Sequence, residues 1–438
     1  MEKTTFSSKT FHSAVPQGSF GDISGGSQRR KEYDSPDSLH SVGWTYPKRI
    51  RLVTPDNPLP LDYGTPFAPI DVEYEMLGEL ASDRNNVILI THALSGDAHV
   101  AGWDATASPT WRPWRLDRPG WWDTVVGPGK PIDTNRFCVL CVNILGSCYG
   151  TTGPASINPA TGRPYGQNFP LVTVGDTVRL QARLLDHLGI KQLYAVCGGS
   201  LGGLQAFEWA VAYPERVVKC IILAAGPRLS AQGLGFNVVG RHAILSDANF
   251  NNGDYYDQAT KPDDGLAAAR MLAHITYLSG QGMEDKFGRR RTTRQIGRNG
   301  SANGTGEQFE VESYLQYQGQ SFVARFDANS YLYITHMLDN YDGTQWGNGS
   351  LQAACARIKA EVMVVSFSTD WLYPPECCRE FVVALMRNRI PVTYMQVESN
   401  YGHDAFLVEA KTVGRMLRAF LLSPTLARRQ FLRGGQCK

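Results

Sequence analysis

The stretch LYAVCGGSLGGLQAF (Leu193–Phe207) decides the fold. It opens with an apolar run typical of a buried strand, and a helix-like segment follows directly after the glycines. Between the two, Gly198-Gly199-Ser200-Leu201-Gly202 matches the pattern G-x-S-x-G, in which a serine occupies a sharp strand-to-helix turn. Glycines on both sides let the backbone bend there. The pattern predicts Ser200 as a raised nucleophile, although a glycine-rich turn with a capping serine fits these residues equally well.

The surrounding chain alternates between short buried strands and helices. Strand-like runs alternate with helix-like segments such as 177–188, 203–213 and 408–422, of which the first and last are amphipathic. This alternation is typical of an α/β protein with a mostly parallel sheet and helices on both faces. The strand-like runs are Val87–Thr91, Phe137–Val142, Leu193–Cys197, Val217–Ala225, Glu361–Phe367 and Val392–Val397.

Two further polar residues follow strands after Ser200. Asp370 comes after the run 361–367, and His403 comes after the run 392–397. The order Ser…Asp…His, with each member just past a strand, is that of the α/β-hydrolase fold, in which all three meet at one sheet edge. His403 would take the Ser200 proton, and Asp370 would orient and stabilise the imidazolium. The three residues are therefore predicted to form a catalytic triad.

An oxyanion hole is predicted from two backbone N–H groups. One belongs to Leu201, directly after the nucleophile, and the other to Leu94, in the loop that follows the strand 87–91. His92 and His99 lie in the same loop, but they precede Ser200, so the triad order assigns them structural or site-lining roles. Together the predicted groups perform acyl transfer. The residues alone leave open whether water or another molecule accepts the acyl group.

Composition limits the remaining possibilities. A net charge of +2 indicates neither a nucleic-acid nor an acidic-membrane partner. No apolar run approaches membrane-spanning length, and the first residues carry no signal-peptide pattern. Nine cysteines without framework spacing are typical of reduced thiols, and neither these nor any histidine cluster predicts a metal site. A cytoplasmic protein is expected; acidic residues near the start make a mitochondrial presequence, the alternative, a poor match.

Composition shifts also divide the chain. Residues 1–42 read as a disordered tail, 43–227 and 350–423 as two parts of the α/β core, and 424–438 as a basic tail. Between the core parts, residues 228–349 lose the strand pattern and read as a helical lid. Within it, the Arg- and Gly-rich segment 281–308 is predicted to be a mobile loop, either solvated or touching the phosphates of an acyl donor.

Several long stretches closely resemble the homoserine O-acetyltransferase family of α/β-hydrolase-fold acyltransferases. The resemblance runs from about Tyr46 to Leu422, and plain esterases do not carry these stretches. They are THALSGDAHVAG (91–102), PGWWDTVVGPGKPIDT (119–134), GTTGPASINPATGRPYG (150–166), GGSLGG around Ser200, RLSAQGLGFNVVGRHAI (228–244), FEVESYLQYQGQSFVARFDANSYLY (309–333) and YGHDAF around His403.

The resemblance implies ping-pong transfer of an acetyl group from acetyl-CoA, a co-substrate rather than a bound cofactor, through Ser200 to homoserine, as in methionine biosynthesis. It implies that Leu94 and Leu201 supply the oxyanion N–H groups, that Arg241 binds the α-carboxylate of the acceptor and that Asp404 holds its α-ammonium. It also implies a homodimer formed through the helical lid.

Departures from the family pattern keep alternatives open. Gly233, Gly235 and Val238 replace larger or acidic residues beside Arg241. The alternative acceptor is therefore serine. The alternative donor is succinyl-CoA, because acetyl- and succinyl-transferring members of the family share this scaffold. An esterase would use water instead.

Overall fold

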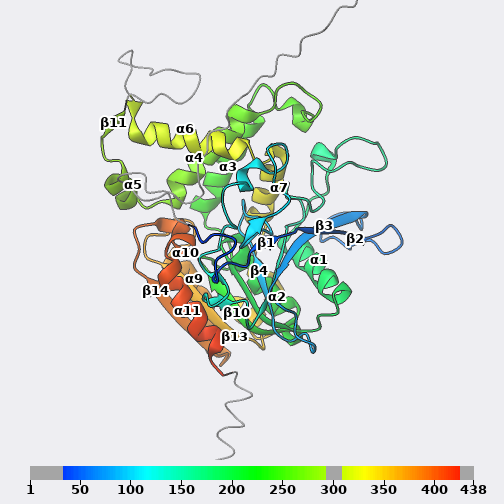
Figure 1. The fold of residues 1–438 in the computed structure, drawn as a ribbon, viewed down its shortest axis with the longest axis vertical. Coiled ribbons are helices and arrows are strands. Elements are labelled where there is room, and N and C mark those ends of the chain that lie inside the picture. Colours follow the sequence, from blue (N-terminus) through cyan, green and yellow to red (C-terminus); the bar gives the residue numbers. More distant parts are fainter. Residues whose placement is uncertain (1–32, 293–307, 425–438) are drawn as a thin grey trace, which may run out of the picture.

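The computed structural model describes residues 33–292 and 308–424. An eight-stranded sheet forms its centre, with the strand order β14-β13-β10-β9-β4-β8-β3-β2 (Figure 1). Seven strands run in the same direction, whereas β3 runs antiparallel to its neighbours β8 and β2. The strands are β2 (Lys48–Val53), β3 (Ile70–Leu77), β4 (Val87–Thr91), β8 (Cys138–Val142), β9 (Leu193–Gly199), β10 (Val217–Leu223), β13 (Glu361–Phe367) and β14 (Val392–Val397).

Two hydrophobic layers sandwich the sheet. One contains α1 (Val174–His187), α2 (Leu201–Ala212) and α9 (Pro375–Arg387); the other contains α11 (Ala410–Leu422) and side chains from the segment 100–132. Every residue of β4, β8 and β13 is buried, which explains why these strands are continuous, mainly apolar runs rather than alternating ones. The mostly parallel sheet with helices on both faces, predicted from the alternating pattern, is confirmed.

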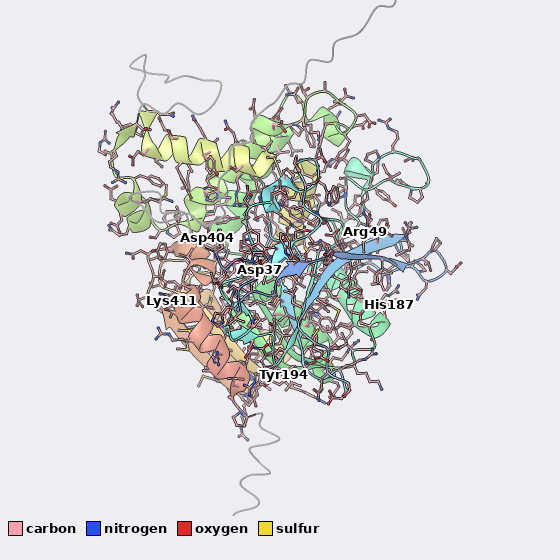
Figure 2. The ribbon with its side chains drawn as sticks, viewed as in Figure 1. Asp37, Arg49, His187, Tyr194, Asp404 and Lys411 are labelled. Atoms are coloured by element: carbon pink, nitrogen blue, oxygen red, sulfur yellow. The ribbon has the colours of Figure 1, made fainter. Side chains whose placement is uncertain are left out.

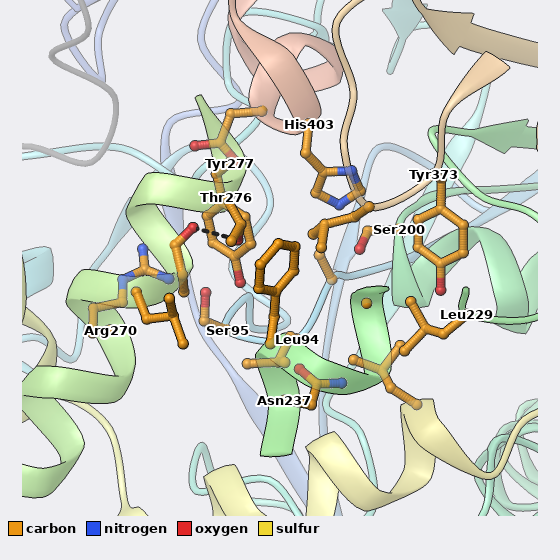
Figure 3. Close-up of a pocket in the computed structure, with 18 of the residues that line it drawn as sticks. Leu94, Ser95, Ser200, Leu229, Asn237, Arg270, Thr276, Tyr277, Tyr373 and His403 are labelled. Atoms are coloured by element: carbon orange, nitrogen blue, oxygen red, sulfur yellow. Dashed lines mark hydrogen bonds between the residues drawn. The ribbon is translucent and has the colours of Figure 1, made fainter. Parts of the chain in front are cut away.

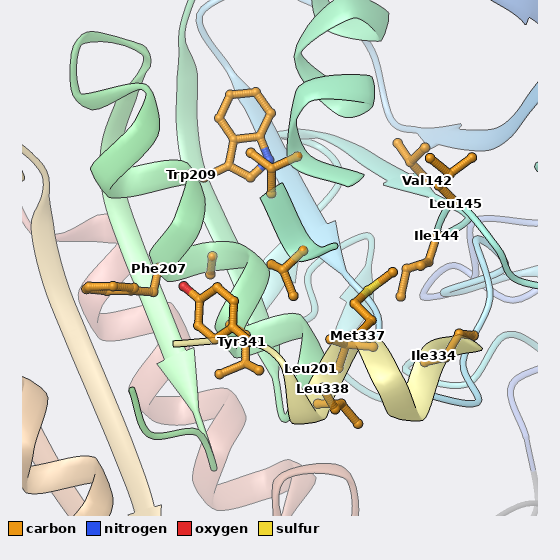
Figure 4. Packing of buried hydrophobic residues seen from close by; sticks show 14 of the residues in the cluster. Val142, Ile144, Leu145, Leu201, Phe207, Trp209, Ile334, Met337, Leu338 and Tyr341 are labelled. Carbon is orange, nitrogen blue, oxygen red and sulfur yellow. The ribbon is translucent and has the colours of Figure 1, made fainter. Parts of the chain in front are cut away.

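A helical insertion separates β10 from β13. It comprises α3 (Ala231–Leu245), α4 (Asp263–Tyr277), α5 (Gly280–Lys286), α6 (Glu310–Val323), α7 (Ala328–Asp339) and α8 (Leu351–Cys355). Most of these helices lie beyond one end of the sheet (Figure 1). Helix α7 packs into the main core, where Met337 and Leu338 lie near Leu201 of α2 (Figure 4). The insertion is thus anchored to the helix that carries the nucleophile.

The functional end of the sheet lies under this insertion. Asp404 lies between the helical insertion and the sheet, whereas Tyr194, near the start of β9, lies at the far end of the molecule (Figure 2). Parallel strands therefore deliver their carboxyl ends, and the loops that follow them, to the space beneath the helices.

Two predicted boundaries differ from the structure. Within the predicted loop 281–308, residues 280–286 form α5, because Ser279 caps the helix by accepting from the N–H of Gly282 at 2.9 Å. Short strands β11 (Arg291–Thr292) and β12 (Gln308–Phe309) pair at the base, and residues 293–307 lie outside the described part. Residues 33–42 also contact the core: the Trp103 indole donates to the Asp34 carbonyl at 3.2 Å. Residues 1–32 and 425–438, predicted as tails, lie outside the description.

The remaining short elements are β1 (Trp44–Thr45), β5 (Trp103–Asp104), β6 (Val126–Gly127), β7 (Ile132–Asp133) and α10 (Ala405–Val408). Within the described ranges, all eight cysteines are free, and no cluster of side chains could hold a metal ion. None of the helices in these ranges is long and apolar enough to cross a membrane.

Candidate active site

The predicted nucleophile occupies a strained turn. Ser200 links β9 directly to α2, and its backbone has φ 57° and ψ −126°. Such a conformation costs a non-glycine residue about 1–3 kcal/mol and persists only where the surroundings impose it. The Ser200 N–H donates to the carbonyl of Leu223 on the neighbouring strand β10 at 3.0 Å. That bond ties the turn to the sheet and leaves the side chain at the strand end.

Two glycines make this turn possible. A Cβ at Gly202 would lie 2.0 Å from the carbonyl oxygen of Thr91, and one at Gly198 would lie 2.2 Å from the Thr91 hydroxyl. Neither position has room for a side chain. The Thr91 hydroxyl donates to the carbonyl of Gly202 at 2.8 Å, so β4 is fastened to the first turn of α2.

His403 and Asp370 meet as predicted for a base and its orienting acid. His403 lies in a short turn after β14, and its Nδ1–H donates to Asp370 Oδ2 at 2.8 Å. The other carboxylate oxygen accepts the N–H groups of Leu372 and Tyr373 at 2.8 and 3.0 Å. These bonds hold the carboxylate, and hence the imidazole tautomer, in one orientation.

The second imidazole nitrogen of His403 faces the nucleophile. Figure 3 shows the Ser200 hydroxyl beside the imidazole ring, and both residues line one cavity of about 110 Å³. Burial opposes protonation of His403, but the charge and hydrogen bond of Asp370 outweigh it, so its pKa is raised. Within the described part of the chain His403 Nε2 has no hydrogen-bond partner, which leaves it available to a substrate or to the serine proton.

The two predicted oxyanion residues come from two segments near Ser200. Leu201 is the first residue of α2, where an N–H has no acceptor within its own helix, and Leu94 lines the cavity from the loop after β4. Both positions fit donors to an oxyanion formed on a carbonyl attacked by Ser200.

The loop that carries Leu94 is fixed by buried polar contacts. His92 accepts the N–H of Ile144 through Nε2 at 3.2 Å, and burial lowers its pKa, so it is a neutral structural residue, as expected. Asp97 pairs with the buried Arg115 at 2.5 Å. Burial alone would raise the pKa of Asp97, but the charges around it, Arg115 foremost, lower it to about 2. A rigid loop suits an oxyanion hole, because preorganised donors need no rearrangement.

An acidic and a basic side chain line the rest of the cavity. Asp404, adjacent to the base, lines it, and so does Arg270 of α4. Arg270 is only 6% exposed and stacks over the ring of Phe322 at 4.7 Å, yet no carboxylate among the described residues forms an ion pair with it. Burial raises the pKa of Asp404, while the charges of His403 and Arg270 oppose that rise. A buried cation without an anionic partner suits a ligand that carries a carboxylate.

Arg241, the arginine expected to bind a carboxylate, does not line this cavity. Its guanidinium forms an ion pair of 2.6 Å with Asp339 at the end of α7. Arg270 occupies the place expected for Arg241, because α4 rather than α3 brings its arginine towards His403. The sequence did hold a signal for Arg270: it is the one strongly charged residue between Gly265 and Leu278, where the chain is otherwise largely apolar. Tyr277 and Tyr373 also line the cavity and were missed.

A serine at a strained elbow, an oriented histidine and two backbone donors define a serine acyl-transfer enzyme of the α/β-hydrolase class. Residues 86–410 match the model of the alpha/beta hydrolase fold family. A homoserine O-succinyltransferase of Alkalilimnicola ehrlichii is 52% identical over 366 residues, 84% of this chain and 92% of that protein. A homoserine O-acetyltransferase of Methanosalsum zhilinae is 47% identical over 369 residues, 84% of this chain and 72% of that protein. The chain belongs to this family of homoserine O-acyltransferases, so the resemblance seen in its motifs is confirmed.

Solved structures agree on the architecture. Homoserine O-acetyltransferase from Bacillus anthracis superposes with a TM-score of 0.75 at 27% identity, covering 87% of this chain and 98% of that one. Esterase E22 superposes with a TM-score of 0.73 at 30% identity, covering 86% and 99%. The same scaffold therefore occurs in proteins named as transferases and as esterases.

Proposed function

We propose that this protein transfers an acyl group from acyl-CoA to the side-chain hydroxyl of homoserine through an acyl-enzyme on Ser200. The observation that carries the proposal is the pair of opposite charges beside the nucleophile. An α-amino acid brings one carboxylate and one ammonium, and the cavity offers the unpaired Arg270 and the carboxylate Asp404. A simple ester presents neither charge, so a hydrolase for plain esters would gain nothing from burying both.

The first half-reaction acylates the enzyme. His403 Nε2 takes the Ser200 proton as the serine oxygen attacks the thioester carbonyl, and the N–H groups of Leu94 and Leu201 stabilise the resulting oxyanion. The C–S bond then breaks, and the CoA thiolate leaves with the proton from the imidazolium. Asp370 stabilises the imidazolium throughout, because its carboxylate accepts the hydrogen bond from Nδ1.

The second half-reaction repeats this chemistry with a different nucleophile. Arg270 would hold the homoserine carboxylate and Asp404 its ammonium, which leaves the side-chain hydroxyl facing the acyl-serine. His403 takes the hydroxyl proton, the new ester bond forms, and the proton returns to Ser200 as its acyl bond breaks. Transfer rather than hydrolysis requires that water be kept away from the acyl-enzyme. The helical insertion, which lies over the carboxyl end of the sheet, would shield the cavity from water.

Acetyl-CoA is the donor that the charges of the cavity favour. Arg270 is the one arginine or lysine among the described lining residues, and the acceptor carboxylate would use it. A succinyl group would bring a second carboxylate into the same space without a second cation. Succinyl-CoA is nevertheless the second candidate, because the homoserine O-succinyltransferase of Alkalilimnicola ehrlichii is 52% identical.

The deciding experiment measures CoA-thiol release by the purified protein. Acetyl-CoA and succinyl-CoA are each combined with homoserine, serine or no acceptor, with Ser200→Ala as the blank. We expect homoserine-dependent release, and the larger kcat/KM identifies the donor; such flux would supply O-acylhomoserine for methionine synthesis. Serine-dependent release would replace the proposed acceptor, and release independent of any amino acid would make the protein a hydrolase.

A further inference from the structure

Asn237 is a polar residue of the cavity wall. It has no role in the catalytic steps described above or in binding the charged groups of homoserine. It lies on α3 and lines the same cavity as Ser200. Figure 3 shows its amide at the cavity wall, separated from Arg270 along that wall. Asn237 therefore lies in a different part of the cavity from Arg270, which is proposed to bind the carboxylate of homoserine.

The orientation of this amide follows from its partner. Asn237 Nδ2 donates to Asp339 Oδ1 at 2.6 Å. A carboxylate only accepts hydrogen bonds, so the NH₂ group must face Asp339 and the carbonyl oxygen must face away from it. That oxygen has no hydrogen-bond partner among the described residues. The carbonyl oxygen of Asn237 is therefore a hydrogen-bond acceptor that remains available to a ligand in the cavity.

Arg241 keeps the carboxylate in place. Asn237 and Arg241 are four residues apart on α3 and thus share a helix face, and both reach Asp339, the second at 2.6 Å. The side chains of Arg241 and Asp339 are only 11% and 12% exposed. The arginine forms an ion pair with one carboxylate oxygen, and the amide donates a hydrogen bond to the other. Arg241 thus acts on the cavity through Asp339 and Asn237 rather than by touching a ligand.

The ligand group that would bind the carbonyl oxygen of Asn237 can be identified from the polar groups of the two substrates. On the proposed function, the acceptor's carboxylate, ammonium and hydroxyl are already matched by Arg270, Asp404 and His403. The remaining N–H donor near the reacting carbonyl is the first amide of the pantetheine arm, two methylenes from the thioester sulfur. We propose that Asn237 Oδ1 accepts a hydrogen bond from this amide, making it a donor-recognition residue held by the positioning residues Asp339 and Arg241.

The test varies the enzyme and the substrate together. S-Acetyl-N-acetylcysteamine carries the amide at the required spacing, and S-(4-oxopentyl) thioacetate replaces its N–H by a methylene. With saturating homoserine, kcat/KM for thiol release reports the acylation half-reaction alone, since the mechanism is ping-pong. We expect the wild type to prefer the amide substrate by about fivefold, the size of one neutral hydrogen bond.

Asn237→Leu, which keeps the volume but loses the acceptor, should reduce that preference to about onefold while kcat/KM for homoserine stays unchanged. Arg241→Gln should reduce the preference in part, and Arg241→Lys should restore it. The matched control is Arg228→Gln, since Arg228 also lies at the start of the insertion and pairs with an aspartate, Asp342, but is half exposed. Should Asn237→Leu fail to fold by its melting curve, Asn237→Ala, which also removes the acceptor, provides the same comparison.

A preference that survives in Asn237→Leu overturns the inference, and so does a loss confined to homoserine, which would move Asn237 to the acceptor site. If the wild type releases no CoA thiol from acetyl-CoA or succinyl-CoA in the presence of homoserine, the proposed function itself fails. If it releases CoA thiol but uses the two short thioesters without preference, or uses neither of them, only the inference about Asn237 fails.

Discussion

Replacing Arg270 by glutamine separates the two halves of the proposed reaction. Arg270 is the buried cation beside Asp404, whereas Arg241 is paired with Asp339. The variant removes the charge expected to hold the acceptor carboxylate and keeps a hydrogen-bonding side chain of similar reach. Acylation of Ser200 by the thioester involves neither Arg270 nor the carboxylate of the acceptor, so the rate of that step should be preserved.

The size of the effect follows from burial. A hydrogen bond to a charged group contributes about 1.5–3 kcal/mol, and the 6% exposure of Arg270 places this bond near the upper end. A loss of about 2–3 kcal/mol corresponds to roughly a 30- to 150-fold lower kcat/KM for homoserine. Arg270→Lys, which keeps the charge but not the planar fork, should fall between the wild type and Arg270→Gln.

The assay is steady-state thiol release at varied homoserine and varied acyl-CoA. Parallel melting curves are needed because Arg270 also stacks over Phe322. Arg241→Gln is the comparison, and its kcat/KM for homoserine should stay within about threefold of the wild type. The reasoning is refuted if Arg241→Gln loses homoserine use while Arg270→Gln retains it, or if Arg270→Gln slows both half-reactions equally.

Three further predictions test the base, the core and the assembly. Asp370→Asn should lower kcat/KM by about 10³–10⁴, because the imidazolium loses its partner. Wild-type kcat/KM should fall as pH drops through the raised His403 pKa. If the acidic limb of this pH profile does not move to lower pH in Asp370→Asn, the assignment of His403 as the base oriented by Asp370 is contradicted. Burial raises the pKa of Glu208 from 4.5 to about 7, so the folded state retains a proton that the unfolded chain releases in this range. The free energy of unfolding should therefore fall by about 3 kcal/mol as the pH rises from 4.5 to about 7. Urea titrations of Glu208→Gln should lack this fall. We also propose that the exposed apolar face of α3 joins two copies of the chain. Val239→Glu should then give monomers in light scattering, whereas the control Val383→Glu, at an exposed valine on α9, should not. A wild-type protein that is itself monomeric would contradict this proposal.

The triad could be found in the sequence because its members are tied to strand ends. Buried parallel strands leave short apolar runs, and chemistry at their carboxyl ends places Ser200, Asp370 and His403 at recognisable positions. The structure brings these three together at one end of the sheet. No knowledge of side-chain packing was needed for that prediction.

The choice between Arg241 and Arg270 could not be made in the same way. Both lie on helices of the insertion, and which helix face meets the sheet depends on how α3, α4 and α7 pack together. Arg241 matched a motif, but Asp339, nearly a hundred residues later, neutralises it. Similarly, the arginines after residue 288 suggested a loop from 281 onward, whereas the capping hydroxyl of Ser279 starts a helix.

The strand order has a consequence for how the protein is made. β13 and β14, which deliver Asp370 and His403, leave the ribosome after the whole insertion. A nascent chain that ends before residue 361 carries the Ser200 elbow without a base, and β10 forms an apolar sheet edge with unpaired backbone groups. Such edges recruit strands from other chains. Catalytic competence and protection from aggregation therefore arrive together, with the last strands synthesised.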